Sequence, residues 1–371
     1  MNLRVEQVIT ESQFESLHEE WNLLLTQSAN NDITLTWEWL YTWWHVFKDD
    51  TRRLMILTVR DLEGRLVGIA PLQWITVRPY FFLPTVRQIT FLAFGEAEED
   101  EICTDYLNFI IHKGDEAEVI AKIWAYLMGD LVPAWDQIVL DRVCSDSANF
   151  LQLRAVTAGL QHQCSYQEVP KGRCYFIPLP GTWDVFMADL DNGLRSKYRR
   201  DVKRSSAKGT VVYTLAQTPS ELKQGFALLK RLHQMRWAEK GSAGVFSSEK
   251  FVMFHEQFSE MALKNGTLQL RWLQLDGMPL AVIYNFLYNH KIYFYQSGID
   301  TQHKDIAPGM LMHGYCIQEA ISQNIREYDF LDGEAAYKAR WTKHFRDLTT
   351  VRIEFNTLKM RIIRWIKAVY K

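Results

Sequence analysis

The sequence predicts an α/β (α+β) fold built from two tandem units, each a mixed, mostly antiparallel sheet flanked by helices. Length is the first observation, because 371 residues exceed what one hydrophobic core usually supports. The second observation is that one order of elements recurs in both halves: helices, an antiparallel meander, a helix, a strand, a helix and a final strand. We place the boundary so that the domains are 1–168 and 169–371.

Composition is that of an ordinary globular protein, with 47% apolar and 23% charged residues. The formal net charge of −2 argues against a general DNA-binding protein. The five cysteines include no C-x-x-C pair and are odd in number, which indicates reduced thiols rather than a zinc site or a disulfide framework. No apolar run is long enough for a membrane span or a signal peptide. We therefore expect a cytoplasmic protein.

The first half opens with helical periodicity, since Phe14, Leu17, Trp21 and Leu24 fall on one stripe. A hairpin follows, in which two β-rich runs are joined at Glu63-Gly64. The expected elements in chain order are helices over 12–25 and 36–47, the hairpin over 54–77, strands over 87–94 and 105–111, a helix over 117–128, a strand over 136–140 and a helix over 147–159.

The second half repeats this order, although the two halves share little sequence that can be aligned by eye. Its meander has turn residues at Asp276-Gly277 and Asn289-His290. The expected elements are a strand over 174–179, helices over 182–190, 194–209, 218–240 and 248–264, strands over 267–277, 279–289 and 291–300, a helix over 307–322, a strand over 326–331, a helix holding Tyr337, a strand over 349–355 and a basic terminal helix.

The stretch YDFLDGEAAYKARW, residues 328–341, gathers acids, a phenol and an ammonium at the end of an apolar strand. On a helix Glu334, Tyr337, Lys338 and Trp341 share one face, where the acid, the phenol and the ammonium could move protons. The alternative is an i,i+4 pair of Glu334 with Lys338 beside a packed Tyr337. Asp329 is unusual in a strand and lies near the carboxyl end, where open α/β sheets bind ligands; a solvated edge strand would explain it equally well.

Residues 266–341 carry a resemblance to a known family. The runs DGMPLAVIYNFLYNHKIYFYQSGID, APGMLM and YDFLDGEAAYKARW resemble the GNAT-superfamily group associated with cellulose and exopolysaccharide biosynthesis, a relative of the Fem peptidyltransferases. TWEWLYTWWHVF and GRLVGIAPLQ fit the N-terminal half of that group, so the resemblance covers most of the chain. It implies tandem GNAT-like domains with the acyl-transfer site in the second. It also implies acetyl-CoA or another acyl-CoA as co-substrate, and no metal.

An acyl-CoA needs a place for its diphosphate, and a helix N-terminus offers one. The run SGIDTQHKDIAPGMLM passes from a strand through a loop into a helix, with Pro308 suited to the first helical turn. This loop has fewer glycines than that of better-known CoA-binding relatives, and a Pro-Gly helix start without a ligand is the alternative. The expected cofactor-binding residues are Lys304, Ile306, Ala307, Gly309 and Met310.

The remaining binding candidates are basic or aromatic. Seven Lys and Arg residues lie between positions 195 and 208, where they could hold an anion or form a solvated helix face. Aromatic side chains near the meander could stack on a sugar or pack in the core. Cys316 is expected to be a buried thiol, and His303 and His313 show no metal-ligand pattern. The expected substrate-binding residues are Arg199, Arg200, Lys203, Trp237, Tyr295 and Gln296.

These features predict an acyl-CoA-dependent N- or O-acyltransferase acting on a sugar, nucleotide-sugar or amine precursor in surface polysaccharide biosynthesis. One alternative is a Fem-like transferase that uses aminoacyl-tRNA, with the basic helix contacting the RNA backbone. Another is a non-catalytic accessory protein that binds polysaccharide-synthesis proteins. The segment 356–371 has an apolar stripe and no acid, which suits weak peripheral contact with an anionic membrane; a helix that packs against the second domain is the alternative.

Overall fold

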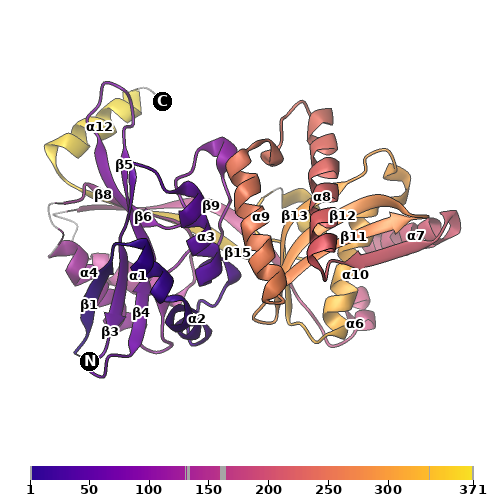
Figure 1. Ribbon diagram of the computed structural model, residues 1–371, viewed down its shortest axis with the longest axis horizontal. Helices are drawn as coiled ribbons and strands as arrows, with labels where there is room; N and C mark the ends of the chain where they lie inside the picture. The colour runs from indigo at the N-terminus through magenta and orange to yellow at the C-terminus, as the bar shows by residue number, and fades with distance from the viewer. Residues whose placement is uncertain (1, 130, 132–133, 159–163, 334, 370–371) are drawn as a thin grey trace. The chain divides into compact units, whose positions relative to one another are not determined.

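The structure, a computed structural model, describes residues 2–129, 131, 134–158, 164–333 and 335–369. Its contacts divide the chain into two compact units (Figure 1). The first unit contains Met1–Glu96, Ile102–Gly172 and Asp347–Lys371, and the second contains Ala97–Glu101 and Arg173–Arg346. The sequence placed a single boundary at 168/169; by contacts, the last 25 residues, Asp347–Lys371, belong to the first unit.

The first unit has two sets of hydrogen-bonded strands. One has the antiparallel order β1-β3-β4-β7, and the other has the order β15-β8-β6-β5-β2, in which β6 and β8 run parallel. The strands are β1 (Arg4–Val8), β2 (Arg52–Leu54), β3 (Ile56–Arg60), β4 (Leu66–Ala70), β5 (Leu72–Val77), β6 (Val86–Phe91), β7 (Ile110–Ile111), β8 (Gln137–Cys144) and β15 (Phe345–Phe355). The helices are α1 (Glu11–Ser16), α2 (His18–Thr26), α3 (Trp37–Phe47), α4 (Glu116–Met128), α5 (Ala148–Thr157) and α12 (Leu358–Val369).

The second unit has strands in the order β10-β11-β12-β13-β14-β9. Neighbours are antiparallel except β13 and β14, which run parallel and are joined through α10. The strands are β9 (Cys164–Pro178), whose residues up to Gly172 belong to the first unit, β10 (Val211–Leu215), β11 (Leu268–Leu275), β12 (Met278–Tyr288), β13 (Lys291–Ile299) and β14 (Glu327–Asp329). The helices are α6 (Trp183–Asp189), α7 (Asn192–Lys208), α8 (Pro219–Glu239), α9 (Glu249–Lys264), α10 (Pro308–Ser322) and α11 (Ala335–Lys338). In each unit, then, one parallel strand pair is connected by a helix.

Local sequence sets the element ends. Both turns of the β11–β13 meander have positive φ at their two central residues, 48° and 81° at Asp276-Gly277 and 48° and 57° at Asn289-His290. Two such residues define the hairpin turn whose twist matches the strands. Several helices start at a side chain that accepts a hydrogen bond from the first turn. These are Thr10, Thr36, Ser147, Thr182, Asp191, Thr218 and Ser248.

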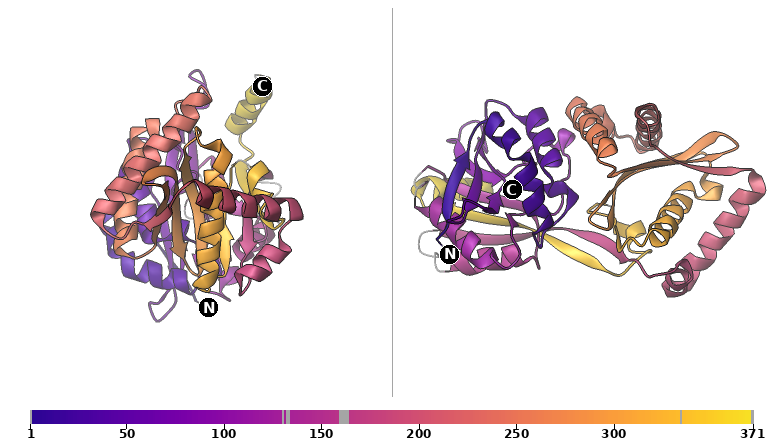
Figure 2. Two further views of the ribbon diagram at one scale, coloured as in Figure 1. Left: turned by 90° about the vertical axis from the view of Figure 1, so that its right-hand side faces the viewer. Right: turned by 60° about the horizontal axis from the view of Figure 1, so that its bottom comes forward.

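Helices cover both faces of the second unit's sheet (Figure 2). On one face, α8 and α9 pack aromatic rings on the strands, as Phe226 does with Tyr284 and Phe258 with Phe286. On the other face, α6, α7 and α10 share one buried cluster with strand residues that include Ile283. Because Ile283 and Tyr284 are adjacent in β12, they point to opposite faces.

Several elements differ from the sequence expectation. The helix over 12–25 is interrupted at Leu17, which ends α1 and begins α2, although Phe14, Leu17, Trp21 and Leu24 are all buried as expected. The strand over 105–111 shortens to β7, because Asp105 binds Arg142 at 2.7 Å and Tyr106 has a φ of 63°. β10 and the first half of β9 were missed because neither shows an alternation of buried and exposed residues. The first half of β9 is largely exposed, and β10 is mostly half-buried.

The core between α9 and the sheet holds a fully buried histidine. Nε2 of His255 lies 3.0 Å from the Tyr295 hydroxyl, and Nδ1 lies 3.4 Å from the Tyr284 hydroxyl. Burial lowers the pKa of His255 to about 3. The folded chain therefore keeps this imidazole neutral, whereas the unfolded chain protonates it near pH 6.5.

Stability should consequently fall as the pH drops below about 6.5, because the unfolded state binds the extra proton. This histidine alone should contribute a slope of about 1.4 kcal/mol per pH unit at most. Urea unfolding of His255→Gln across pH 7 to 4 should show a flatter profile than the wild type. The exposed His45→Gln is the control, and equal slopes in all three proteins would contradict the assignment.

Candidate active site

The parallel pair β13–β14 separates part-way along β13. The strands pair from Lys291↔Glu327 to Tyr293↔Asp329, where β14 ends. β13 continues to Ile299, paired with β12. In the β12 pairing, Tyr284 faces Gln296 and Asn285 faces Phe294, so Tyr295 is the extra residue of a bulge. We call the edge of β13 beyond the last pair, residues 294–299, the open edge.

One backbone donor in this segment is satisfied by a side chain rather than by a strand. The Ser297 N–H donates to Oε1 of Gln296 at 2.9 Å. This N–H is directed away from the β12 ladder, because it bonds to a side-chain amide. A ligand carbonyl could take the place of that amide oxygen without breaking the sheet. A preorganised N–H of this kind can stabilise negative charge that develops on a thioester carbonyl.

Positive charge gathers where α10 begins. Ala307 precedes the helix with a left-handed φ of 49° and offers no side-chain cap, and Pro308 is the first helical residue. Two cations of α7 reach the residues just before it. Nη1 of Arg204 donates to the Asp305 carbonyl oxygen at 2.6 Å, and Nζ of Lys208 pairs with the Asp305 carboxylate. That ammonium lowers the pKa of Asp305.

The other expected cofactor residues have varied environments. Lys304 lies in the turn before α10, Met310 is half-buried, and Ile306 is fully buried in the core. A Cβ on Gly309 would lie 2.6 Å from Cδ1 of Ile299. The glycine therefore allows α10 to pack closely on β13, so the consequence of a larger residue there is first a packing conflict and only then an effect on a ligand.

The Asp329 carboxylate is fully buried and has partners on both oxygens. It has no exposed surface, and β14 lies between β13 and β9, so the solvated edge strand is wrong. Its Oδ1 accepts from the Leu331 N–H at 2.7 Å, and its Oδ2 lies 3.3 Å from Nη1 of Arg346. The same guanidinium binds Glu327 at 2.7 Å. These contacts tie the end of β14 to the start of β15.

Tyr337 and Lys338 lie in a helix shorter than expected. α11 ends at Lys338, so Trp341 is not on its face, and Glu334 lies outside the described residues. Lys338 is buried and donates to the carbonyl oxygens of Leu331 and Asp332 at 3.0 and 2.7 Å, which fixes the turn after β14. Tyr337 is half-buried, with its ring 5.9 Å from that of His313.

The ring that lies beside Tyr337 belongs to His313, a buried residue of α10. Its Nδ1 lies 3.0 Å from the Tyr328 hydroxyl. Burial, and then the charge of Lys338, lowers the pKa of His313 to about 3, so the ring is neutral. The phenol of Tyr337 thus lies against a neutral imidazole, close in sequence to the end of β14.

Two hollows flank α7 and divide its predicted basic residues. Arg199 and Lys203 line the smaller one, about 320 Å³, with Trp183 of α6 and Tyr315 of α10. Arg200 lines a larger groove of about 1050 Å³, which we call the α6–α7 groove. Its apolar residues include Phe186, Leu190, Leu194 and Trp341. Its charged residues are Lys197, Arg200, Arg340 and Lys343 with His344, and the acids Asp189 and Asp191.

The predicted aromatic ligands lie elsewhere. Tyr295 packs on His255, on the α9 face of the sheet, with ring centroids 4.6 Å apart. Trp237 lies at the end of α8, 5.8 Å from the ring of His233 and under Nζ of Lys240 at 4.8 Å. The structure therefore does not bring Tyr295 together with the basic residues of α7, which lie on the opposite face.

The sequence did not single out every residue of this region. Arg204 and Lys208 were noted only as members of the basic run, although they follow Arg200 by one and two helical turns, so helical spacing could have indicated their common face. Ser297 gave no signal, because a backbone N–H does not depend on the side chain. Cys316 is buried as expected, 2.9 Å from the Tyr213 hydroxyl, and its pKa is raised to about 11 mainly by burial. The described residues contain no cluster of three or more His, Cys, Asp or Glu side chains suited to a metal ion.

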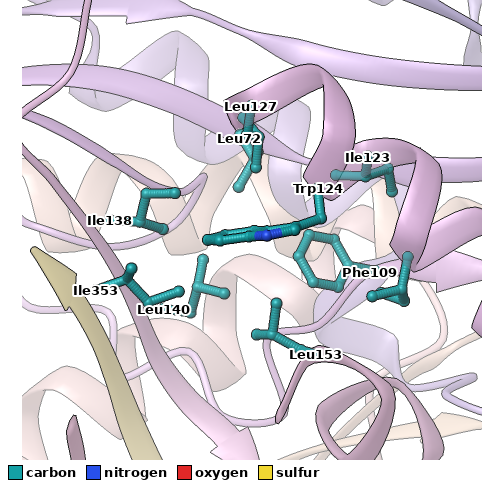
Figure 3. Close-up of a pocket in the computed structure, with 10 residues that line it drawn as sticks. Leu72, Phe109, Ile123, Trp124, Leu127, Ile138, Leu140, Leu153 and Ile353 are labelled. Carbon is teal, nitrogen blue, oxygen red and sulfur yellow. The ribbon is translucent and has the colours of Figure 1, made fainter. Parts of the chain in front are cut away.

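The first unit has a small apolar cavity in its core. Figure 3 shows the space beside α4 and β8, where the Trp124 indole lies among apolar side chains such as Leu72, Ile138 and Leu140. The cavity is about 10 Å³, roughly one water in size, and every lining residue is apolar. This cavity therefore has no room for a ligand larger than about one water.

Comparison with known proteins finds a family match within the second unit. Residues 192–339 match the acetyltransferase (GNAT) domain family. No curated protein matches the chain in sequence.

Solved structures resemble the chain over nearly its whole length. The crystal structure of FemX has a TM-score of 0.62 at 13% identity, covering 99% of this chain and 100% of that one. The C-terminal domain of a putative lysylphosphatidylglycerol synthetase from Agrobacterium fabrum has a TM-score of 0.53 at 7% identity, covering 97% and 96%. L-PGS from Bacillus licheniformis has a TM-score of 0.51 at 11% identity, covering 93% and 94%. At these identities the likeness concerns the fold.

The expectation of a mixed α/β fold with GNAT-type domains is confirmed. The domain match contains α7, the open edge of β13, the start of α10 and α11. The second unit of this chain thus contains the segment, residues 192–339, that matches the acetyltransferase (GNAT) domain family.

Proposed function

We propose that the second unit transfers an acyl group from an acyl-CoA to an amine or hydroxyl of a small acceptor. The observation that carries the proposal is the placement of two complementary features at the ends of one short loop. The Ser297 N–H lies before the loop, and the cationic start of α10 lies after it. The first suits a thioester carbonyl, and the second suits a diphosphate.

In this proposal the donor lies along the open edge of β13. Arg204, Lys208 and Lys304 hold the diphosphate together with the N–H groups of α10. The thioester carbonyl replaces the Gln296 amide oxygen at the Ser297 N–H. The acceptor nitrogen or oxygen attacks the carbonyl carbon and loses its proton to a base. The C–S bond then breaks, and the Tyr337 hydroxyl gives its proton to the departing thiolate.

We also propose a class of acceptor. We infer that it is a sugar or nucleotide-sugar precursor of a surface polysaccharide, because residues 266–341 resemble the GNAT proteins associated with cellulose and exopolysaccharide biosynthesis. The α6–α7 groove supports an acceptor of this kind, because its volume of about 1050 Å³ and its basic side chains suit a large anionic molecule such as a nucleotide sugar.

Calorimetric titration with acetyl-CoA tests the donor. Removing both cations in Arg204→Ala/Lys208→Ala should weaken binding about tenfold or more, since each charge-assisted bond contributes about 1.5–3 kcal/mol. Asp305→Ala should tighten binding, because its carboxylate competes with a phosphate for the Lys208 ammonium. Opposite signs from neighbouring residues are not expected of a purely structural effect.

The matched control is Lys223→Ala/Arg231→Ala, which removes the same charges from exposed positions of α8. Binding by this variant should equal that of the wild type. If the wild type shows no saturable binding of acetyl-CoA or CoA, the donor assignment fails.

An aminoacyl-tRNA donor is the second candidate, favoured by the basic side chains of the α6–α7 groove. Four cations around one groove suit an RNA backbone, and such binding weakens steeply with salt. Tight, salt-dependent binding of tRNA by a protein that ignores CoA would assign the donor to tRNA. If the protein binds neither CoA nor tRNA, the remaining candidate function is that of an accessory protein of a polysaccharide-synthesis complex.

A further inference from the structure

The C-terminal helix α12 uses a different face for packing than its sequence suggests. Met360 and Ile363 are buried against Leu83 and Val86 of the first unit, with Tyr80 and Ile366 at the border. The expected packing against the second domain is therefore wrong. The stripe of Leu358, Ile362 and Trp365, one helix face by spacing, remains outside, with exposed fractions of 72%, 46% and 68%.

The loop between β5 and β6 adds two more exposed rings beside this helix. Phe81 is 87% exposed and Phe82 is 51% exposed. Phe82 stacks on Tyr80, which packs on the same cluster as α12, so the loop and the helix are neighbours within the first unit. Figure 1 shows them at one end of that unit. We call Phe81, Phe82, Leu358, Ile362 and Trp365 the apolar tip.

The charge around the apolar tip has a single sign. No Asp or Glu occurs from Phe355 to Lys371, which contains five Lys and Arg residues, and none occurs from Gly64 to Gly95. Arg78 and Arg361 are exposed beside the loop and the helix. Two cations of α12 already have acidic partners in the first unit. Lys359 pairs with Asp136, and Arg364 pairs with Glu354.

We propose that the apolar tip docks the protein on an anionic membrane surface. Exposed aromatic and aliphatic side chains insert at the level of the lipid headgroups, and the surrounding Arg and Lys side chains meet anionic lipids. A second copy of the chain fits this surface less well, because it would bring two acid-free cationic helices together. None of the helices in the described ranges is long and apolar enough to cross a bilayer, so the contact is peripheral.

Co-sedimentation with vesicles tests the proposal on the full chain. The wild type should bind vesicles of equimolar phosphatidylglycerol and phosphatidylcholine at low salt, and phosphatidylcholine alone much more weakly. Phe81→Ser/Trp365→Ser should lower the partition coefficient at least about tenfold with an unchanged melting temperature. Point variants are preferable to truncation of α12, because truncation would expose Leu83 and Val86.

The matched control is Leu23→Ser/Leu62→Ser, which removes two apolar side chains that are 60% and 80% exposed elsewhere in the first unit. Its vesicle binding should equal that of the wild type. Wild-type protein that ignores the anionic vesicles, or a tip variant that binds them equally well, overturns the proposal. So does a wild-type dimer that the tip substitutions convert to a monomer, because the tip would then be a self-association surface.

Discussion

Replacing Tyr337 by phenylalanine is expected to lower kcat about 10²–10⁴-fold, the range for loss of a general acid. The substitution removes one hydroxyl and keeps the ring, which lies 5.9 Å from His313 and 6.3 Å from Phe330. Melting temperature should therefore change little. The loss should appear in kcat more than in the KM for the donor, because proton delivery to the thiolate belongs to the chemical step.

Tyr41→Phe is the matched control, since Tyr41 is also half-buried and stacks on Trp37 in the first unit. It should leave kcat unchanged. Wild-type turnover by Tyr337→Phe would show that this side chain only packs. The corresponding role of Glu334 stays a prediction from the sequence, because that residue lies outside the described part of the chain.

Replacing Arg346 by alanine is expected to give the largest loss of stability, about 3–5 kcal/mol in the free energy of unfolding. The substitution leaves Asp329 without the guanidinium, although that carboxylate has no exposed surface. It also leaves Glu327 without its 2.7 Å partner and uncovers the Phe176 ring, which the guanidinium overlies at 3.8 Å. Because Arg346 itself is 24% exposed, the lower end of that range is the expected value. Urea unfolding measures it.

A double-mutant cycle separates charge from packing. Arg346→Met keeps the side-chain stem over Phe176, and adding Asp329→Asn removes the stranded charge, so the double variant should be more stable than Arg346→Met alone. Lys48→Ala, which breaks the exposed pair with Glu11, should cost less than about 1 kcal/mol. If Asp329→Asn abolished turnover without affecting stability, Asp329 would be catalytic rather than structural.

The sequence predicted those parts of the fold whose local signals agree with the tertiary structure. The meander β11–β13 follows from two turn dipeptides, and α3 follows from a capping Thr36 and a strong apolar stripe. The first half of β9 gave no such signal. It is a strand because of the partners available to it, and no residue pattern within Cys164–Arg173 indicates this.

The site could be predicted only as a region. Residues 296–338 were correctly placed at a strand end followed by a helix start, because Pro308 and the acidic turn mark those ends. The sequence could not show that Asp329 and Lys338 are used internally, since their partners are Arg346 and the backbone of the turn. It could not show that Arg204 and Lys208 meet the loop about one hundred residues later, because that contact depends on how α7 packs on α10.

The shared strand β15 has a consequence for synthesis on the ribosome. Its residues Leu348, Val351 and Ile353 are buried in the first unit, where β15 pairs with β8 along the chain from Cys144 back to Gln137. These residues are translated after the entire second unit. While the second unit is being translated, the buried strand β8 of the nascent first unit therefore lacks its neighbour β15. The part of the protein that is translated first is thus completed last, opposite to the usual N-terminal-first order of domain folding.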